Sequence, residues 1–223
     1  MERKASEQTA AESHIAAYER HLGRSVTRIF ADLNAFMQLV QRWQKVQNLV
    51  SRETPGDLWH RHILDSLQIL PLIDGSTENL NIVDIGSGGG FPALPLAIAL
   101  KGRPFSMQLI ESNSRKCAFL RAAAREFDLP ITVHTARIEA IDPQSIGSVD
   151  VFTSRALAPM PLLLGYLHRF WRPESRAVLH KGREFGEELK SADSDWLYDV
   201  LNHRSVTDRD GVILEISNLR PKR

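Results

Sequence analysis

The chain has 223 residues, of which 43% are hydrophobic and 25% are charged. These shares are those of an ordinary folded protein, and they exclude collagen-like structure and disorder over most of the chain. The 28 basic and 27 acidic residues leave a formal charge of +1. This balance excludes a strongly basic nucleic-acid coat and an acidic solvating tail, although it permits a local basic face.

The chain contains one cysteine, Cys117, so no internal disulfide is expected and a reducing compartment is favoured. The first residues carry charges without an apolar run behind them, which is not the pattern of a signal peptide. The longest apolar-looking run, 91–100, is about half of the roughly 20 residues that a membrane span needs. We therefore expect a cytoplasmic protein with no membrane partner.

The first third of the sequence predicts helices. Residues 1–13 are polar and small, and we expect them to be flexible. Apolar residues then recur every three or four positions from Val26 to Val46, which predicts one long amphipathic helix that ends near Asn48. The turn residues 55–57 begin a second helix. Because residues 14–78 have no strand of their own, we expect them to form a helical extension packed on the domain that follows.

From residue 79 onward, short apolar strands alternate with helices. Strands are predicted at 82–85, 105–110, 131–133, 149–152 and 177–179, and helices at 94–100, 115–127, 161–170 and from 186. This alternation predicts βαβ units and a parallel sheet wound on both faces. Residues 196–206 and 212–216 flank a turn signal and predict an antiparallel hairpin. Residues 79–223 therefore have the α/β layout of a Rossmann-like class I methyltransferase domain, a mostly parallel sheet with a C-terminal hairpin.

The most informative stretch, 84–90, follows a predicted strand, opens a helix and reads D-I-G-S-G-G-G. Glycines there allow positive φ and a close approach of a ligand, which the free N–H groups of the helix N-terminus then face. The dinucleotide fingerprint G-x-G-x-x-G fails at its last glycine, where Phe91 stands. The alternative pattern D-x-G-x-G-x-G fits at Asp84, Gly86, Gly88 and Gly90.

This second pattern resembles motif I of S-adenosylmethionine-dependent methyltransferases. An acid before the turn suits a ligand that carries an ammonium and a sulfonium cation better than it suits a pyrophosphate. Glu111, at the end of the next strand, is placed to accept both ribose hydroxyls of an adenosine, which fits S-adenosylmethionine and NAD equally. We therefore expect a nucleoside cofactor, and S-adenosylmethionine before NAD.

The end of the fourth strand limits the kind of methyl acceptor. Residues 153–156 read Thr-Ser-Arg-Ala, where enzymes acting on exocyclic amines carry Asn/Asp-Pro-Pro-Tyr/Phe. Cys117 lies within a predicted helix, as a small buried residue, and not on the exposed loop that a pyrimidine C5 nucleophile needs. An acceptor such as guanine N7 has a free lone pair and no proton to lose, so it needs alignment and no general base. No catalytic residue is assigned.

An ordered set of motifs resembles one family. The motifs are Trp43 to Ser66 with Asn48-Leu49 and Arg61-His62-Ile63-Leu64-Asp65-Ser66, Asp84 to Pro95, Lys116-x-x-Phe119-Leu120, Arg137-x-Glu139, Ser154-Arg155-Ala156 and Lys181-Gly182. In this order, over about residues 35–219, they look like the small-subunit ribosomal RNA guanine-N7 methyltransferase G family, also called glucose-inhibited division protein B. The resemblance implies methylation of N7 of a guanosine (position 527, in the 530 loop) of 16S rRNA, in the small ribosomal subunit or an assembly intermediate.

The resemblance also implies site residues. The family's cofactor contacts fall on Gly86, Phe91, Ile138, Glu139 and Arg155. Arg155 lies beside the expected methyl-transfer point, where its planar fork suits either the methionine carboxylate or an RNA phosphate. The family usually has a glycine where Ala93 stands, and we expect the added methyl to shift the helix start slightly.

Basic side chains are the candidates for RNA contacts, because they meet phosphates. The candidates are Arg61, His62, Lys181 and Arg183. Lys181 is the strongest, since it ends a strand at the carboxyl edge of the sheet. His62 also has a structural alternative, because it shares a helix face with Asp65 and Ser66 and can brace that helix against the following domain. The scattered histidines and single cysteine predict no metal site, and we expect a monomer.

Three functions remain open on the sequence alone. The first is a ribosomal RNA N7 methyltransferase, which the ordered motifs favour. The second is a methyltransferase that acts on a small molecule or a protein, with the helical extension as a lid. The third is an NAD-dependent oxidoreductase, which the failed dinucleotide fingerprint disfavours.

Overall fold

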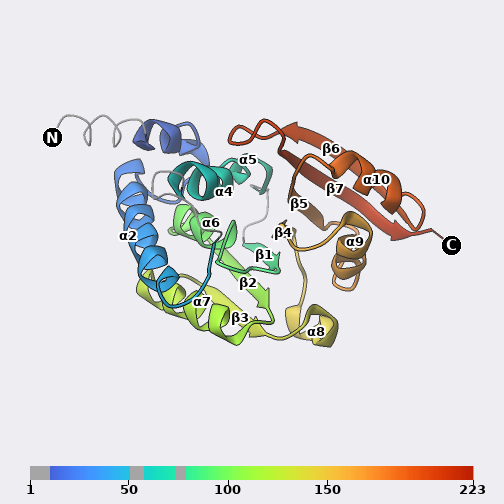
Figure 1. The fold of residues 1–223 in the computed structure, drawn as a ribbon, viewed down its shortest axis with the longest axis horizontal. Helices are drawn as coiled ribbons and strands as arrows, with labels where there is room; N and C mark the ends of the chain where they lie inside the picture. The colour runs from blue at the N-terminus through green and yellow to red at the C-terminus, as the bar shows by residue number, and fades with distance from the viewer. Residues whose placement is uncertain (1–10, 51–57, 74–78, 223) are drawn as a thin grey trace.

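The computed structural model describes residues 11–50, 58–73 and 79–222 (Figure 1). In this part of the chain, seven strands form one sheet in the order β3-β2-β1-β4-β5-β7-β6. The strands are β1 Leu80–Ile85, β2 Phe105–Glu111, β3 Ile131–Thr135, β4 Val151–Arg155, β5 Arg176–Lys181, β6 Trp196–Arg204 and β7 Val212–Pro221. Strands β1 to β5 are parallel, and β7 pairs antiparallel with β5 and β6. The predicted parallel sheet with a C-terminal hairpin is confirmed.

Strand β4 begins two residues later than the sequence predicts. The prediction was 149–152, whereas the strand runs from Val151 to Arg155. Asp150, just before the strand, accepts the backbone N–H of Asn81 at 2.7 Å through its carboxylate. Residues 153–155 therefore lie within the strand and not after it.

Helices cover both faces of the sheet (Figure 1). They are α6 Ala93–Leu100, α7 Ser114–Glu126, η3 Ile138–Ala140, α8 Pro143–Ile146, α9 Met160–His168 and α10 Phe185–Ala192. Neighbouring residues of a strand point to opposite faces, so Ile82 joins a core with α6 and α7, while Val83 joins a second core with α8 and α9. The short helix α8 was not predicted, although Asp142 caps it and Pro143 stands in its first turn.

The helical extension lies against α6 and α7 (Figure 1). Its elements are η1 Glu19–His21, α2 Val26–Gln44, the π-helical η2 Trp59–Leu64, α4 Asp65–Leu67 and α5 Leu70–Ile73. The buried face of α2 consists of Ile29, Leu33, Phe36, Leu39 and Val40. These side chains belong to the same core as α6 and α7, so the extension and the sheet share one hydrophobic core.

The start of the chain departs from the prediction. Residues 11–16 are helical, and Ala11 and Ile15 are buried. Residues 1–13 were predicted to be flexible, but residues 11–13 are part of a packed helix, because Ala11 and Ile15 are buried in the core. Residues 1–10 lie outside the described residues.

Helix α2 ends before the predicted position at Asn48. Its last residue is Gln44, whose side-chain Oε1 accepts the backbone N–H groups of Leu49 at 2.7 Å and Val50 at 3.1 Å. The side chain of Gln44 thus satisfies backbone N–H groups that would otherwise need helical partners, and the chain turns away from the helix axis. Val46, predicted to lie on the buried stripe, is 77% exposed for this reason.

The second predicted helix is observed in pieces. Its predicted start, 55–57, lies outside the described residues. The chain passes from η2 through α4 to α5, and the wide turns of η2 contain His62. A π-helical turn is rare and often occurs at functional sites.

Gly89 allows the extension to approach the glycine-rich turn. A Cβ on Gly89 would lie 2.5 Å from the carbonyl oxygen of Leu49, closer than nonbonded atoms approach. Leu49 is buried and its N–H is held by Gln44. The middle glycine of the run 88–90 therefore serves the packing of the extension.

We expect Gly89→Ala to destabilise the protein, because the obstructing atom belongs to a backbone that moves only with the extension. The expected loss is about 1–3 kcal/mol of unfolding free energy, measured by urea denaturation. Gly186→Ala in α10 is the matched control, since its Cβ would meet nothing within 4 Å among the described atoms. A G89A variant as stable as the wild type would contradict the packing role.

Candidate functional site

Two pockets lie at the carboxyl edge of the parallel strands, where ligands bind in open α/β sheets. The β2 pocket is lined by Gly86, Ile110, Glu111, Ser112, Ala136, Arg137, Ile138, Glu139, Leu157 and Tyr166. The β5 pocket is lined by Asp65, Arg155 to Pro159, His180 to Gly182, Glu188, Ser205, Asp208 and Gly211 to Ile213. Leu157 lines both pockets, so they are neighbours across this side chain.

The glycine-rich turn forms one wall of this region. Gly86, Gly88 and Gly90 have φ angles of 73°, 54° and 84°, the left-handed region that favours glycine. A Cβ on Gly86 would collide with Leu157, and one on Gly90 would collide with Leu94. For a Cβ on Gly88, the only described atom within 4 Å would be the carbonyl oxygen of Gly86, at 3.7 Å. The backbone is therefore open to a ligand at Gly88.

Asp84 places a buried carboxylate beneath the turn. The residue is 1% exposed, and its Oδ1 accepts the hydroxyl of Thr153 at 2.6 Å. Its Oδ2 has no hydrogen-bond partner among the described residues. Burial raises the pKa of Asp84 to about 6. An unmet buried acceptor that becomes anionic near neutral pH fits a cationic ligand group.

Glu111 connects the turn to the end of β2. Its Oε2 accepts the N–H of Gly88 at 2.9 Å, and its Oε1 accepts the N–H of Asn113 at 2.7 Å. A carboxylate has about four lone-pair sites, so these two bonds leave room for hydroxyl donors from a ligand in the β2 pocket.

Residues 138 and 139 also line the β2 pocket. Ile138 is buried and offers an apolar surface. Glu139 accepts the hydroxyl of Tyr166 at 2.9 Å. A hydrogen bond from its own backbone N–H, together with that hydroxyl, holds the pKa of Glu139 below its usual value. Tyr166 was not found by sequence reasoning, because an aromatic residue in a helix carries no local signal of such a bond.

Arg155 joins the edge of β4 to the extension. Its Nη1 donates to Asp65 Oδ2 at 3.0 Å and to the carbonyl oxygen of Arg61 at 3.1 Å. Its Nη2 donates to His62 Nδ1 at 2.8 Å. The guanidinium lies 5.3 Å from the ring centre of Phe91, and the His62 ring lies 4.8 Å from the same ring. These are the contacts of a brace between the two parts of the molecule.

Asp65 is bonded from three further positions. Its Oδ1 accepts the hydroxyl of Thr207 at 2.6 Å and the amide of Gln68 at 2.8 Å. Its carbonyl oxygen lies 2.8 Å from His180 Nε2. Together with Arg155, these bonds tie the extension to β4, β5 and the β6–β7 turn. The sequence indicated a bracing role only through the helix face of Asp65.

The four RNA candidates fall into two pairs. The Lys181 side chain is 8% exposed, and its ammonium donates to Glu188 Oε2 at 2.6 Å and to a main-chain carbonyl at 2.7 Å. His62 is buried. Arg61 is exposed, and Arg183 is 79% exposed and pairs with Asp210. Arg61 and Arg183 therefore face solvent, whereas His62 and Lys181 are hydrogen-bonded to other residues of the protein.

The described helices include none long and apolar enough to cross a membrane. Over the same residues, histidine, cysteine and acidic side chains do not gather in a group of three or more that would hold a metal ion.

The chain matches known sequences over most of its length. The model of the family described as rRNA small subunit methyltransferase G matches residues 29–215. The ribosomal RNA small subunit methyltransferase G of Bartonella tribocorum is 45% identical over 190 residues, which cover 85% of this chain and 87% of that protein. The protein of the same name from Brucella ovis is 42% identical over 200 residues, which cover 89% and 92%.

Solved structures share the fold. An O-methyltransferase from Bacillus cereus, in complex with SAH, has a TM-score of 0.55 at 14% identity, over 82% of this chain and 91% of that chain. A SAM-dependent methyltransferase from Aquifex aeolicus has a TM-score of 0.53 at 14% identity, over 72% and 92%. The fold is therefore that of class I methyltransferases. On the match over residues 29–215, the chain belongs to the rRNA small subunit methyltransferase G family.

Proposed function

We propose that this protein transfers a methyl group from S-adenosylmethionine to N7 of a guanosine, at position 527 in the 530 loop of 16S rRNA. The observation that carries the proposal is the open backbone at Gly88 beside the unmet acceptor of Asp84, in a chain whose relatives are named for small-subunit rRNA methylation. S-adenosylmethionine supplies an electrophilic methyl group on a sulfonium cation.

The residues of the β2 pocket and the glycine-rich turn suit this cofactor. Asp84, buried beneath the turn, offers negative charge to its cationic portion, and the turn is open to a close approach at Gly88. Glu111 has acceptor capacity for ribose hydroxyls, and Ile138 offers an apolar surface to the adenine. The proposed cofactor residues are Asp84, Gly86, Gly88, Gly90, Phe91, Glu111, Ile138, Glu139 and Arg155.

Methylation of guanine N7 requires mainly that the enzyme position the two substrates correctly. The N7 lone pair forms the new bond and no proton leaves, so a general base is not needed. The base becomes cationic during the transfer, which disfavours unpaired cations nearby. Arg155 and Lys181 are already paired with Asp65 and Glu188, so the edge of the sheet does not oppose the developing charge.

The proposed partner is 16S rRNA within the small ribosomal subunit or an assembly intermediate, with Arg61 and Arg183 as the exposed candidates for phosphate contacts. Ribosomal subunits are assembled in the cytoplasm, which is where we place the enzyme, as a monomer that uses no metal.

The proposal is tested by offering labelled S-adenosylmethionine with small ribosomal subunits, naked 16S rRNA, or free guanosine, and mapping the product by mass spectrometry. We expect label on one guanosine of the rRNA, as 7-methylguanosine. Label that reaches only a free nucleoside or a protein would reject the rRNA acceptor. Calorimetry that detects NADH binding and no S-adenosylmethionine binding would reject methyl transfer altogether.

Arg155→Ala is expected to abolish methyl transfer and to lower the unfolding free energy by about 3 kcal/mol. The reason is that Asp65 would lose a partner that is largely buried with it. Arg183→Ala is the control for stability alone, because this side chain is 79% exposed and its loss should change the unfolding free energy by less than about 0.5 kcal/mol. Full activity of R155A would contradict the placement of the site, and urea denaturation measures the stability difference.

Cofactor affinity should rise about tenfold between pH 5 and pH 7. With the pKa of Asp84 at about 6, the carboxylate is mostly protonated at pH 5 and mostly ionised at pH 7, and only the ionised form attracts a cation. Calorimetry of S-adenosylmethionine binding across this range measures the effect. Asp84→Asn should bind more weakly and independently of pH, whereas an affinity that falls with pH in the wild type would contradict the assignment.

A further inference from the structure

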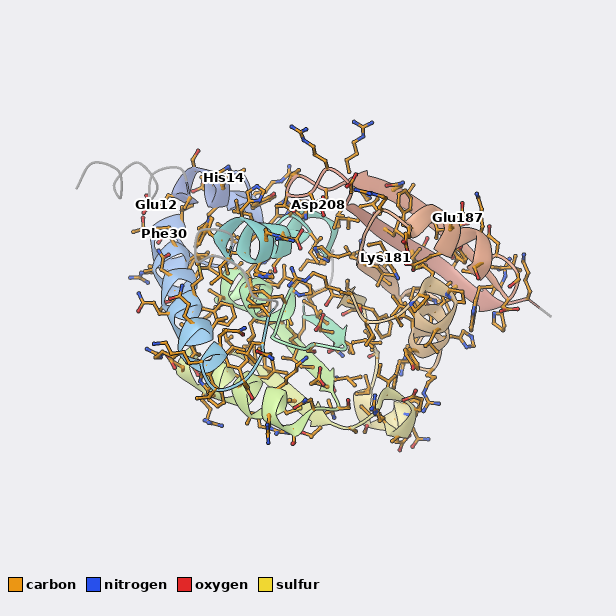
Figure 2. All side chains as sticks on the ribbon, in the orientation of Figure 1. Glu12, His14, Phe30, Lys181, Glu187 and Asp208 are labelled. Atoms are coloured by element: carbon orange, nitrogen blue, oxygen red, sulfur yellow. The ribbon has the colours of Figure 1, made fainter. Side chains whose placement is uncertain are left out.

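The β5 pocket contains an unmet acceptor that the proposed cofactor site does not use. Figure 2 labels two of its lining residues, Lys181 at the end of β5 and Asp208 in the β6–β7 turn. His180, the neighbour of Lys181, is 7% exposed and lines the same pocket. Its Nδ1 has no hydrogen-bond partner in the described part of the chain.

The hydrogen position on His180 follows from its other contact. Nε2 lies 2.8 Å from the carbonyl oxygen of Asp65, and a carbonyl can only accept, so Nε2 carries the hydrogen. Burial lowers the pKa of His180 below its usual value, so the ring is neutral near pH 7. In a neutral imidazole with hydrogen on Nε2, the Nδ1 atom is an acceptor. A buried acceptor without a donor is costly.

The remaining lining of the β5 pocket is also rich in acceptors. Three acidic residues, Asp65, Glu188 and Asp208, belong to the lining. The two basic side chains there, Arg155 and Lys181, already donate to Asp65 and Glu188. The apolar part of the wall consists of Ala156, Leu157, Ala158, Pro159, Val212 and Ile213. Such a pocket suits a flat ligand that presents hydrogen-bond donors to His180.

Guanine supplies two neighbouring donors. Its Watson–Crick edge carries N1–H and the N2 amine as donors beside the O6 acceptor, whereas adenine presents an acceptor at N1. N7 lies on the opposite side of the purine. Since Leu157 lines both pockets, a guanine whose N2 amine lies toward β5 directs N7 toward the β2 pocket.

We propose that the β5 pocket receives the acceptor guanine and that His180 Nδ1 accepts a hydrogen bond from its N2 amine. His180 is then a specificity-determining residue that distinguishes guanine from the other bases. This inference rests on the proposed function, because it takes the methyl acceptor to be a guanine.

Two substitutions separate the Nδ1 acceptor from the Asp65 contact. In His180→Gln, the longer amide reaches the Asp65 carbonyl from the place of Nε2 and leaves no acceptor at the place of Nδ1. In His180→Asn, the side-chain oxygen takes the place of Nδ1. His203→Gln is the matched control, because His203 pairs with Glu215 outside this pocket. Thermal unfolding and S-adenosylmethionine calorimetry of each variant report folding and cofactor binding.

The substrates are small subunits reconstituted with 16S rRNA that carries guanosine or inosine at the methylated position. Inosine lacks the N2 amine and keeps N7. The wild type and H203Q should prefer guanosine by about tenfold in kcat/KM, which is the loss expected for one neutral hydrogen bond. H180Q should methylate both substrates at the same rate, and H180N should recover most of the preference.

The outcomes distinguish this inference from the proposed function. A wild type that labels no guanosine in rRNA rejects the proposed function. A wild type that methylates guanosine and inosine equally well overturns the proposed recognition of the N2 amine by the β5 pocket, whatever the stability of the variants. An H180Q variant that keeps the wild-type preference overturns the role of His180 alone.

Discussion

The hydrogen bonds of the Arg155 guanidinium connect the functional edge of the sheet to the helical extension. Without them, Asp65 and Arg155 would be largely buried charges lacking their main partners, which costs several kcal/mol. The same bonds hold His62 against Phe91, the residue after the glycine-rich turn. The extension is therefore a fixed wall of the site. A lid that opens would have to break this brace and expose the buried face of α2, which shares a core with the sheet.

Basic and acidic side chains near the site are paired with one another, in keeping with the near-neutral composition. Lys181 meets Glu188, and Arg183 meets Asp210, so basic residues near the site are matched by acids close in space. The net charge of +1 therefore excludes salt-driven coating of nucleic acid and leaves room for an enzyme that recognises one nucleotide by shape. What the composition could not indicate is that Lys181, at the predicted edge of the sheet, is paired with a carboxylate of its own chain.

Local patterns predicted the parts of the structure that local forces decide. The spacing of Gly86, Gly88 and Gly90 predicted a turn with positive φ, and all three have it. The role of Gly89 was out of reach, since the obstructing carbonyl of Leu49 lies 40 residues earlier and no pattern connects the two. His180 was missed for a similar reason. A polar residue in a buried strand shows no sign, in the sequence, of which of its atoms lacks a partner.

Asp84 Oδ2 on strand β1 and His180 Nδ1 on strand β5 both lack a hydrogen-bond partner among the described residues. Asp84 lowers stability where it is ionised. The folded state holds its proton more tightly than the unfolded chain, so stability falls as pH rises from about 4 to above 6, by about 3 kcal/mol. Such a cost persists where a ligand makes use of it. The sheet order places β4 between β1 and β5, with Thr153 beside Asp84 and Arg155 beside His180. The proposed cofactor at Asp84 and the proposed guanine at His180 would therefore meet above the end of β4, where Arg155 is braced.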